Sequence, residues 1–135
     1  MTSTVLYEGN LRTKATHLQS GNSILTDAPT DNEGKGENFS PTDLVATALA
    51  SCMATIMGIY AKNHQLNIEQ TRFEITKIMT SEPRRISEIQ VNVYVANGKN
   101  LDELTRKKLI HVALNCPVAK SLNTDIHQNI NFYFE

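Results

Sequence analysis

The sequence has 135 residues and a mass of 15.1 kDa, with 40% hydrophobic residues, 20% charged residues and a formal net charge of −1. These values are typical of one globular domain, so we expect a single domain over residues 1–135. The nearly neutral charge gives no electrostatic basis for binding a nucleic acid or an anionic membrane, and we expect neither partner.

The N-terminus, MTSTVLYEGN, has neither the basic segment nor the apolar segment of a signal peptide, so we expect a cytoplasmic protein. An uncharged run over residues 44–61 reaches about the minimum length of a membrane span, roughly 18 residues. We interpret this run as a core helix, because it is rich in Ala, Ser and Thr and lacks an aromatic belt. In a reducing compartment the two cysteines are expected to be thiols.

The first part of the chain predicts three short strands over residues 3–8, 11–18 and 22–27. Two turn signals rich in Gly and Asn separate them, which is typical of β-hairpins. Residues 28–39 contain a proline, two glycines and several charges, and they predict a loop that leads into the main helix.

The segment 40–62, SPTDLVATALASCMATIMGIYAK, predicts the helix around which the chain is organised. Ser40 suits the N-cap, Pro41 suits the first helical position, and Asp43 stands where the acid of a capping box belongs. The segment is apolar on nearly every side, as in a helix that is buried all round. Cys52 lies in its middle.

Alternating apolar residues over 68–80 and 86–96 predict a β-hairpin with its turn at 81–85. A last strand is expected over 128–135. The predicted fold class is α+β, with antiparallel strands wrapped around a buried central helix.

A second helix is predicted over 101–114, with Asn100 as its N-cap and Asp102 in its first turn, where the helix dipole favours an acid. A short helical piece should follow Cys116 and extend through Leu122.

The two cysteines are the candidate reactive groups. Cys116 precedes Pro117 and suits the N-cap of the short helix, where free backbone amides would favour its thiolate. Cys52 lies in the middle of a helix, where every backbone amide is already hydrogen-bonded within the helix and cannot stabilise a thiolate. A cysteine on an apolar helix is most often inert packing. The residues alone therefore leave open whether Cys52 reacts and which sulfur would act first.

Taken together, SPTDLVATALASC and NCPVAKSL resemble the OsmC/Ohr family of osmotically inducible and organic hydroperoxide resistance proteins. In that family a proline-capped helix carries the first redox cysteine, and a second cysteine follows in a C-P-[VY]-type turn. Here the two cysteines are 116 − 52 = 64 residues apart. The TDAP segment, the glycine-bearing loop and the strand order also match.

The resemblance implies a thiol-dependent peroxidase that reduces organic hydroperoxides in oxidative stress defence. Cys52 would become a sulfenic acid, and Cys116 would condense with it to a disulfide. The four histidines do not form metal-ligand spacing with either cysteine, so we expect no metal. The resemblance implies no cofactor, only an external thiol reductant, which in family members is often a lipoyl-protein dithiol.

Family members also use an arginine from the N-terminal strands, held by a glutamate just inside the central helix. Arg12 is the only arginine before that helix. Alignment on the helix places Thr42 at the glutamate position, with Asp43 next to it. A threonine cannot make the bidentate ion pair that orients a guanidinium. This departure leaves the substrate open.

The resemblance further implies an intertwined homodimer with each site lined by both chains, which would explain so apolar a helix in a small protein. Arg12 would then lie near one cysteine pair. An alternative function is a non-enzymatic OsmC-like protein that binds a small hydrophobic or thiol ligand in the dimer cavity.

Overall fold

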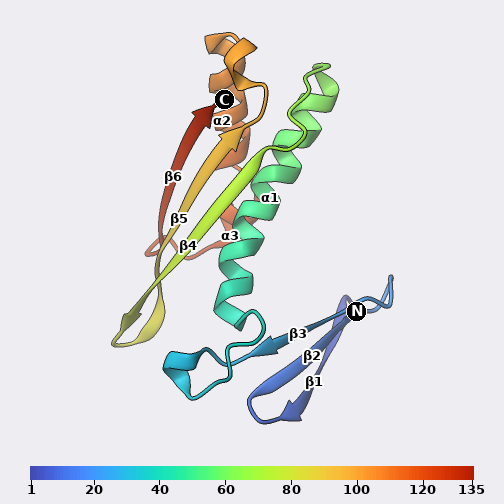
Figure 1. Cartoon of the computed structure of the whole chain (residues 1–135), viewed down its shortest axis with the longest axis vertical. Helices are drawn as coiled ribbons and strands as arrows, with labels where there is room; N and C mark the ends of the chain where they lie inside the picture. The colour runs from blue at the N-terminus through green and yellow to red at the C-terminus, as the bar shows by residue number, and fades with distance from the viewer. The chain divides into compact units, whose positions relative to one another are not determined.

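The computed structural model describes all residues from 1 to 135 and is an α+β structure with two separate β-sheets (Figure 1). Its elements are β1 (Ser3–Gly9), β2 (Arg12–His17), β3 (Ser23–Asp27), η1 (Thr30–Asn32), α1 (Pro41–Asn63), β4 (Arg72–Ser81), β5 (Arg84–Val95), η2 (Gly98–Asn100), α2 (Glu103–Leu114), α3 (Pro117–Ser121) and β6 (His127–Phe134). The chain divides into two compact units, Met1–Val45 and Ala46–Glu135, which are described in turn.

The first unit contains an antiparallel sheet in the order β1-β2-β3. All three predicted strands are confirmed to within one residue at each end. This sheet leaves large apolar side chains exposed, and they come from adjacent positions along the strands, hence from both faces. They are Val5, Leu6, Tyr7, Ile24 and Leu25.

Helix α1 begins with the predicted capping box. The Asp43 backbone N–H donates to Ser40 Oγ at 3.1 Å, and the Ser40 backbone N–H donates to Asp43 Oδ2 at 2.9 Å. These two bonds satisfy donors that the first turn of a helix leaves without a partner. Ser40 itself is only 2% exposed, so the cap lies in a nearly dry environment.

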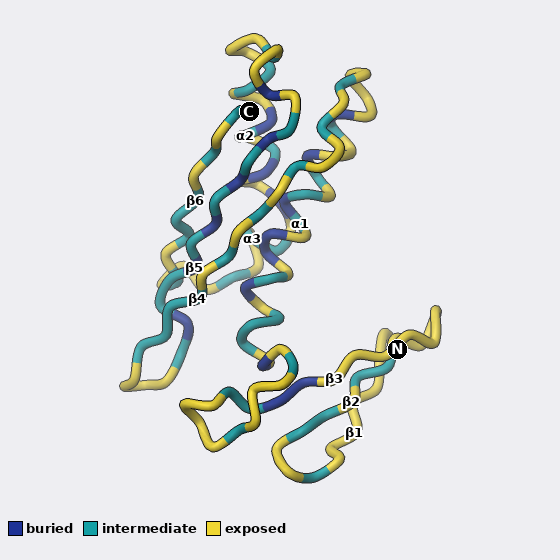
Figure 2. Tube along the Cα trace, viewed as in Figure 1, coloured by how far each residue is buried: buried dark blue, intermediate teal, exposed yellow.

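Within one chain, α1 is buried along a single stripe (Figure 2). Burial on all sides was expected together with a homodimer, and it stays a prediction. The buried residues are Ala46, Leu49, Ala50, Met53, Met57 and Ala61. The opposite stripe is uncharged yet exposed, and it includes Ala48, Ser51, Thr55 and Ile59. By length and composition α1 could span a membrane. Its buried stripe belongs to the core of the second unit, so we interpret it as a core helix.

The second unit contains a sheet in the order β4-β5-β6, with α1 and α2 contributing to the core. The predicted apolar face of β5 is confirmed, because Ile89, Val91, Val93 and Val95 are fully buried. Strand β4 begins at Arg72, later than predicted. The preceding residues form a turn in which the Thr71 N–H donates to the Ile68 carbonyl.

Strand β6 pairs with β5 in parallel, whereas the sequence predicted antiparallel strands. The physical reason is the connection: α2 and α3 carry the chain back across the sheet, so that β6 runs in the same direction as β5. Gly98 lies beside the end of β6, and a side chain there would meet Phe134 at 2.8 Å. Because the backbone at residue 98 approaches Phe134 so closely, only a residue without a side chain fits there.

Helix α2 begins two residues later than predicted, and its N-cap is Asp102, not Asn100. The Thr105 backbone N–H donates to Asp102 Oδ1 at 2.7 Å, which lowers the pKa of Asp102. Asn100 instead ends the short 3-10 turn η2, and Leu101 after it is extended. An aspartate two positions further along therefore takes the capping role.

Substitution of Ser40 by alanine is expected to lower the free energy of unfolding by about 1 kcal/mol, because the Asp43 amide loses its acceptor at a buried helix start. Urea denaturation of the variant and the parent protein measures this difference. Ser3→Ala, at an exposed position of β1, serves as the control and should change stability by less than about 0.5 kcal/mol. Equal effects at the two positions would contradict a stabilising role of the cap.

Candidate functional site

Cys52 lies in the middle of α1, one residue before the fully buried Met53. Its side chain is half-buried and packs against the core of the second unit. Solvent can therefore reach part of the residue, while the rest contacts apolar side chains. The helix fixes the direction of its Cα–Cβ bond, so the sulfur has few positions available.

Cys116 is the N-cap of α3, as predicted from the proline that follows it. Its backbone is extended, with φ −66° and ψ 155°, and Pro117 occupies the first helical turn. The Cys116 N–H donates to the Ala113 carbonyl at 3.2 Å, which ties the residue to the end of α2. The side chain is completely buried.

The structure brings the two cysteines near each other: Cys52 packs against the hydrophobic cluster that contains Cys116, and it is one of the groups that raise the pKa of the Cys116 thiol. Both are free thiols in this state. They meet in a hydrophobic cluster to which α1, β5 and α2 contribute. The fold thus places two cysteines that lie 64 residues apart (116 − 52) at one hydrophobic cluster.

The pKa of the Cys116 thiol is raised above its ordinary value, mainly because burial disfavours the thiolate. The neighbouring Cys52 sulfur raises it further, whereas the backbone amides of Ala119 and Val118 act in the opposite direction. The expectation that the helix start would favour a Cys116 thiolate is therefore wrong in its net outcome. The amides do contribute as expected, but desolvation is the larger effect.

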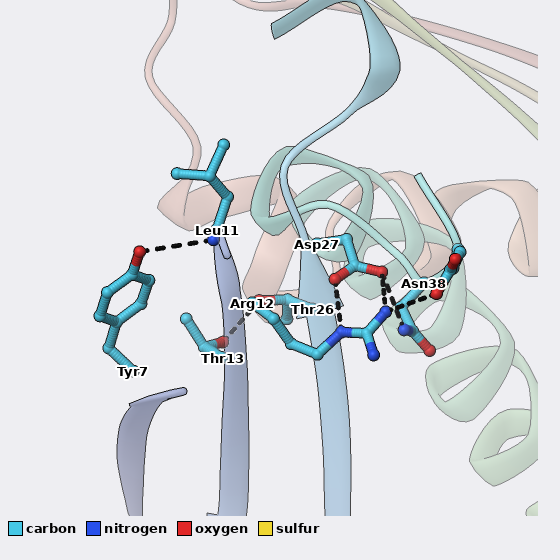
Figure 3. A network of polar contacts seen from close by, with 8 residues as sticks. Tyr7, Leu11, Arg12, Thr13, Thr26, Asp27 and Asn38 are labelled. Carbon is cyan, nitrogen blue, oxygen red and sulfur yellow. Dashed lines mark hydrogen bonds and ion pairs between the residues drawn. The ribbon is translucent and has the colours of Figure 1, made fainter. Parts of the chain in front are cut away.

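Arg12 opens β2 in the first unit, directly opposite Asp27 in the antiparallel register of β2 and β3. Its guanidinium makes a bidentate ion pair with that aspartate: Nε donates to Oδ1 at 2.7 Å and Nη2 donates to Oδ2 at 2.9 Å (Figure 3). Nη2 also donates to Glu37 Oε2 at 2.7 Å. The guanidinium thus has two acidic partners in its own unit.

Asp27 is 1% exposed, which is rare for a carboxylate unless it is paired. Besides the guanidinium of Arg12, it accepts a hydrogen bond from the Asn38 side-chain amide at 2.9 Å. Arg12 is the main cause of an Asp27 pKa well below its usual range. The pair therefore stabilises the folded state fully above the pKa of an unfolded aspartate, about 3.9, and this stabilisation is lost as the pH falls further.

The loop after β3 folds back to supply Glu37 and Asn38. The Gly36 N–H donates to the Ala28 carbonyl at 3.3 Å. Gly34 lies so close to that carbonyl that a side chain would overlap it. The loop thus returns tightly to the end of β3.

Of the two supporting residues named from the sequence, Asp43 serves in the capping box and Thr42 Oγ1 lies 3.2 Å from Ser40 Oγ. The carboxylates that bind Arg12 were missed, namely Asp27 and Glu37. One signal was available for Asp27. Asp27 ends the third predicted strand, at the position where a β-meander places it opposite Arg12.

A cavity of about 680 Å³ lies in the second unit, beside the C-terminal half of α1. Met57 and Gly58 line it from the helix, with Leu66, Ile68 and Phe73 from the segment that follows. Neither cysteine is among its lining residues. The cavity is therefore a second feature of this unit, separate from the sulfur pair.

Comparison with solved structures shows the same fold in other proteins. A protein from Psychrobacter arcticus 273-4, named for osmotic stress and detoxification responses, is 52% identical with a TM-score of 0.94 over 98% of this chain and 96% of its own. An organic hydroperoxide resistance protein OsmC from Legionella pneumophila is 14% identical with a TM-score of 0.73. The match covers 98% of this chain and 97% of the Legionella chain. The organic hydroperoxide resistance protein OhrB of Bacillus subtilis is 16% identical with a TM-score of 0.66, covering 98% of each chain.

No curated protein matches the sequence. The model of the family described as OsmC-like protein matches residues 34–131, which include both cysteines and most of the chain. This match agrees with the resemblance seen in the helix and in the segment around Cys116. The chain belongs to the OsmC-like protein family.

Proposed function

We propose that this protein is a thiol-dependent peroxidase that reduces organic hydroperoxides in peroxide stress. The observation that carries the proposal is the placement of Cys52 against the hydrophobic cluster that contains Cys116, near enough for Cys52 to raise the pKa of the Cys116 thiol. Two thiols near each other can form a disulfide with little movement of the backbone. The substrate class is suggested by the names of the Legionella pneumophila and Bacillus subtilis proteins, which share the fold.

Cys52 is the thiol that attacks the peroxide in this proposal. Burial and the neighbouring sulfur raise the pKa of Cys116, so in the resting pair Cys116 keeps its proton. Cys52 is also the more accessible of the two, being half-buried where Cys116 is fully buried. The resemblance to the family assigned the same order, and the burial of Cys116 now gives a physical reason for it.

In the first step the Cys52 thiolate attacks one peroxide oxygen, and the O–O bond breaks. The alcohol leaves with one oxygen and takes up a proton, while the sulfur is oxidised to a sulfenic acid. In the second step the Cys116 sulfur attacks the sulfenic sulfur. An S–S bond forms, and hydroxide leaves as water with the proton from Cys116.

A dithiol reductant then completes the cycle, since exchange with the disulfide returns both cysteines to thiols and leaves the reductant as a disulfide. A lipoyl-protein dithiol is the reductant that the family resemblance suggests. The cytoplasm keeps such dithiols reduced, which is why we propose that the protein acts there. Every step uses only sulfur and oxygen chemistry.

Arg12 is proposed to bind and polarise the hydroperoxide. A guanidinium is a fixed positive charge with several donors, so it can hold a peroxide oxygen and stabilise the developing alkoxide. We propose that the active protein is a homodimer in which Arg12 approaches a cysteine pair. Two exposed surfaces support a dimer: the apolar side chains of β1 and β3, and the uncharged stripe on α1 that includes Ile59.

The cavity beside α1 favours a second candidate function, the binding of a small hydrophobic ligand without turnover. Its volume of about 680 Å³ falls within the ordinary range of ligand pockets. Its lining is largely apolar and includes neither cysteine. In this alternative the thiols would stay reduced when an organic hydroperoxide is added.

Brief treatment with iodoacetamide at about pH 7.5 is expected to alkylate Cys52 well before Cys116, because Cys116 is buried and its pKa lies above that of a free thiol, about 8.5. Mass spectrometry of tryptic peptides measures both rates. The Cys116 rate should keep rising with pH above 8.5 in the wild-type protein. In Cys52→Ser the rise should shift to lower pH, since one cause of the raised pKa is gone. Faster labelling of Cys116 than of Cys52 would overturn the assigned order.

Addition of one equivalent of cumene hydroperoxide is expected to convert the two thiols to a Cys52–Cys116 disulfide, and excess dihydrolipoamide should then support repeated turnover. Cys52→Ser should reduce the rate to that of the reagents alone. Cys116→Ser should form a sulfenic acid at Cys52 that dimedone captures. If the wild-type protein neither forms the disulfide nor turns over with any dithiol, the peroxidase proposal fails and the binding function remains.

Light scattering after size exclusion is expected to give twice the chain mass of 15.1 kDa. Ile59→Lys should lower this mass, because it puts a charge into the uncharged stripe of α1. The matched control is Leu104→Lys on α2, where a leucine is 62% exposed, and it should leave the mass unchanged. A wild-type mass near that of one chain would exclude the dimer.

A further inference from the structure

Asp27 holds the guanidinium of Arg12 along the edge formed by Nε and Nη2. Nε and Nη2 face the two oxygens of Asp27, and the third nitrogen points away from that carboxylate (Figure 3). A guanidinium carries five N–H donors. Asp27 uses two of them and Glu37 uses a third, so both N–H groups of Nη1 stay available for an oxygen that does not belong to these partners.

The two carboxylates differ in how firmly they are fixed. Asp27 is 1% exposed, is opposite Arg12 in the β2–β3 register, and accepts a second bond from Asn38. Its backbone N–H also donates to the Phe39 carbonyl at 3.1 Å. Glu37 is 63% exposed and belongs to a loop. An exposed ion pair contributes little to holding a side chain, whereas a buried bidentate pair determines both its position and its plane.

We propose that Asp27 is the positioning residue of the site: from β3 it fixes the guanidinium plane of Arg12 so that Nη1 is presented to the hydroperoxide. This inference rests on the proposed function for what Arg12 binds. The residue that orients Arg12 is thus on a strand, whereas the candidates named from the sequence, Thr42 and Asp43, are on the helix. Glu37 touches the same guanidinium but does not fix it.

The geometry explains why an aspartate is needed at this place. Two parallel N–H···O bonds define a plane, and a single acceptor would leave the guanidinium free to rotate about it. In Asp27→Asn the amide would turn an NH2 group toward one of the Arg12 donors, and the buried pair would lose its charge balance. Arg12 would remain in the chain but would no longer hold one orientation.

Four proteins test this inference: the wild type, Asp27→Asn, Arg12→Ala and the double variant. The rate of Cys52–Cys116 disulfide formation with cumene hydroperoxide is measured in a single turnover. Asp27→Asn is expected to slow this rate about 10- to 100-fold, the loss typical of a misplaced reacting group. In the Arg12→Ala background the same substitution should cause no further loss, because Asp27 acts only through Arg12.

Glu37→Gln is the matched control, since Glu37 binds the same guanidinium from an exposed position. It should change the rate less than about threefold. The iodoacetamide rate of Cys52 should be the same in all variants, which separates a loss of positioning from damage to the thiol pair. An Asp27→Asn rate within twofold of wild type, or losses that multiply in the double variant, would overturn the inference.

A measurement on the wild-type protein alone covers the case in which Asp27→Asn does not fold or no peroxidase activity is found. The Arg12 Nε–H is expected to give a nitrogen-15 NMR signal whose hydrogen exchanges slowly, because it is bonded to a buried carboxylate. Arg72 is the internal control, since it pairs with Glu74 while its side chain is 54% exposed. If wild type turns over no hydroperoxide, the proposed function fails, and with it the presentation of Nη1 to a hydroperoxide. A slow Arg12 signal would then still support Asp27 as the residue that orients the Arg12 guanidinium. Equal exchange at both arginines would refute that role.

Discussion

The placement of Cys52 and Cys116 near each other in one hydrophobic cluster is the constraint on which the rest of this structure depends. A disulfide requires its two Cα atoms to approach within about 4.4–6.8 Å, so both backbone segments must be held firmly. The buried stripe of α1 holds Cys52 against the sheet. Cys116 is held by its bond to Ala113, itself fully buried at the end of α2, and by the restricted backbone before Pro117.

In the proposed reaction, the balance of forces at Cys116 would let a single pair of thiols act in a fixed order. Helix α3 has only five residues, and its two amides do not offset the cost of a buried thiolate. Part of the raised pKa comes from the Cys52 sulfur itself. Oxidation of Cys52 to a neutral sulfenic acid would remove that contribution. Cys116 would then ionise more readily at the moment when its partner becomes electrophilic.

Features set by neighbouring residues could be predicted from the sequence, and features set by tertiary pairing could not. The capping box of Ser40 and the N-cap role of Cys116 follow from a few adjacent residues, and both are confirmed. The direction of β6 depends on how two helices cross the sheet, which no local pattern encodes. The pKa of Cys116 was misjudged for the same reason, because its burial comes from residues far along the chain.

The acidic partner of Arg12 shows the same limit in the candidate site. Thr42 and Asp43 were considered because they stand near an expected helix position, whereas Asp27 is 15 residues from Arg12 and lies beside it only through strand pairing. A strand position suits this task, because antiparallel register fixes which residues face each other across the sheet. A carboxylate on β3 can therefore orient a guanidinium on β2 as rigidly as one on a helix could. The chemical requirement is two oxygens in one plane, and the fold can supply them from more than one element.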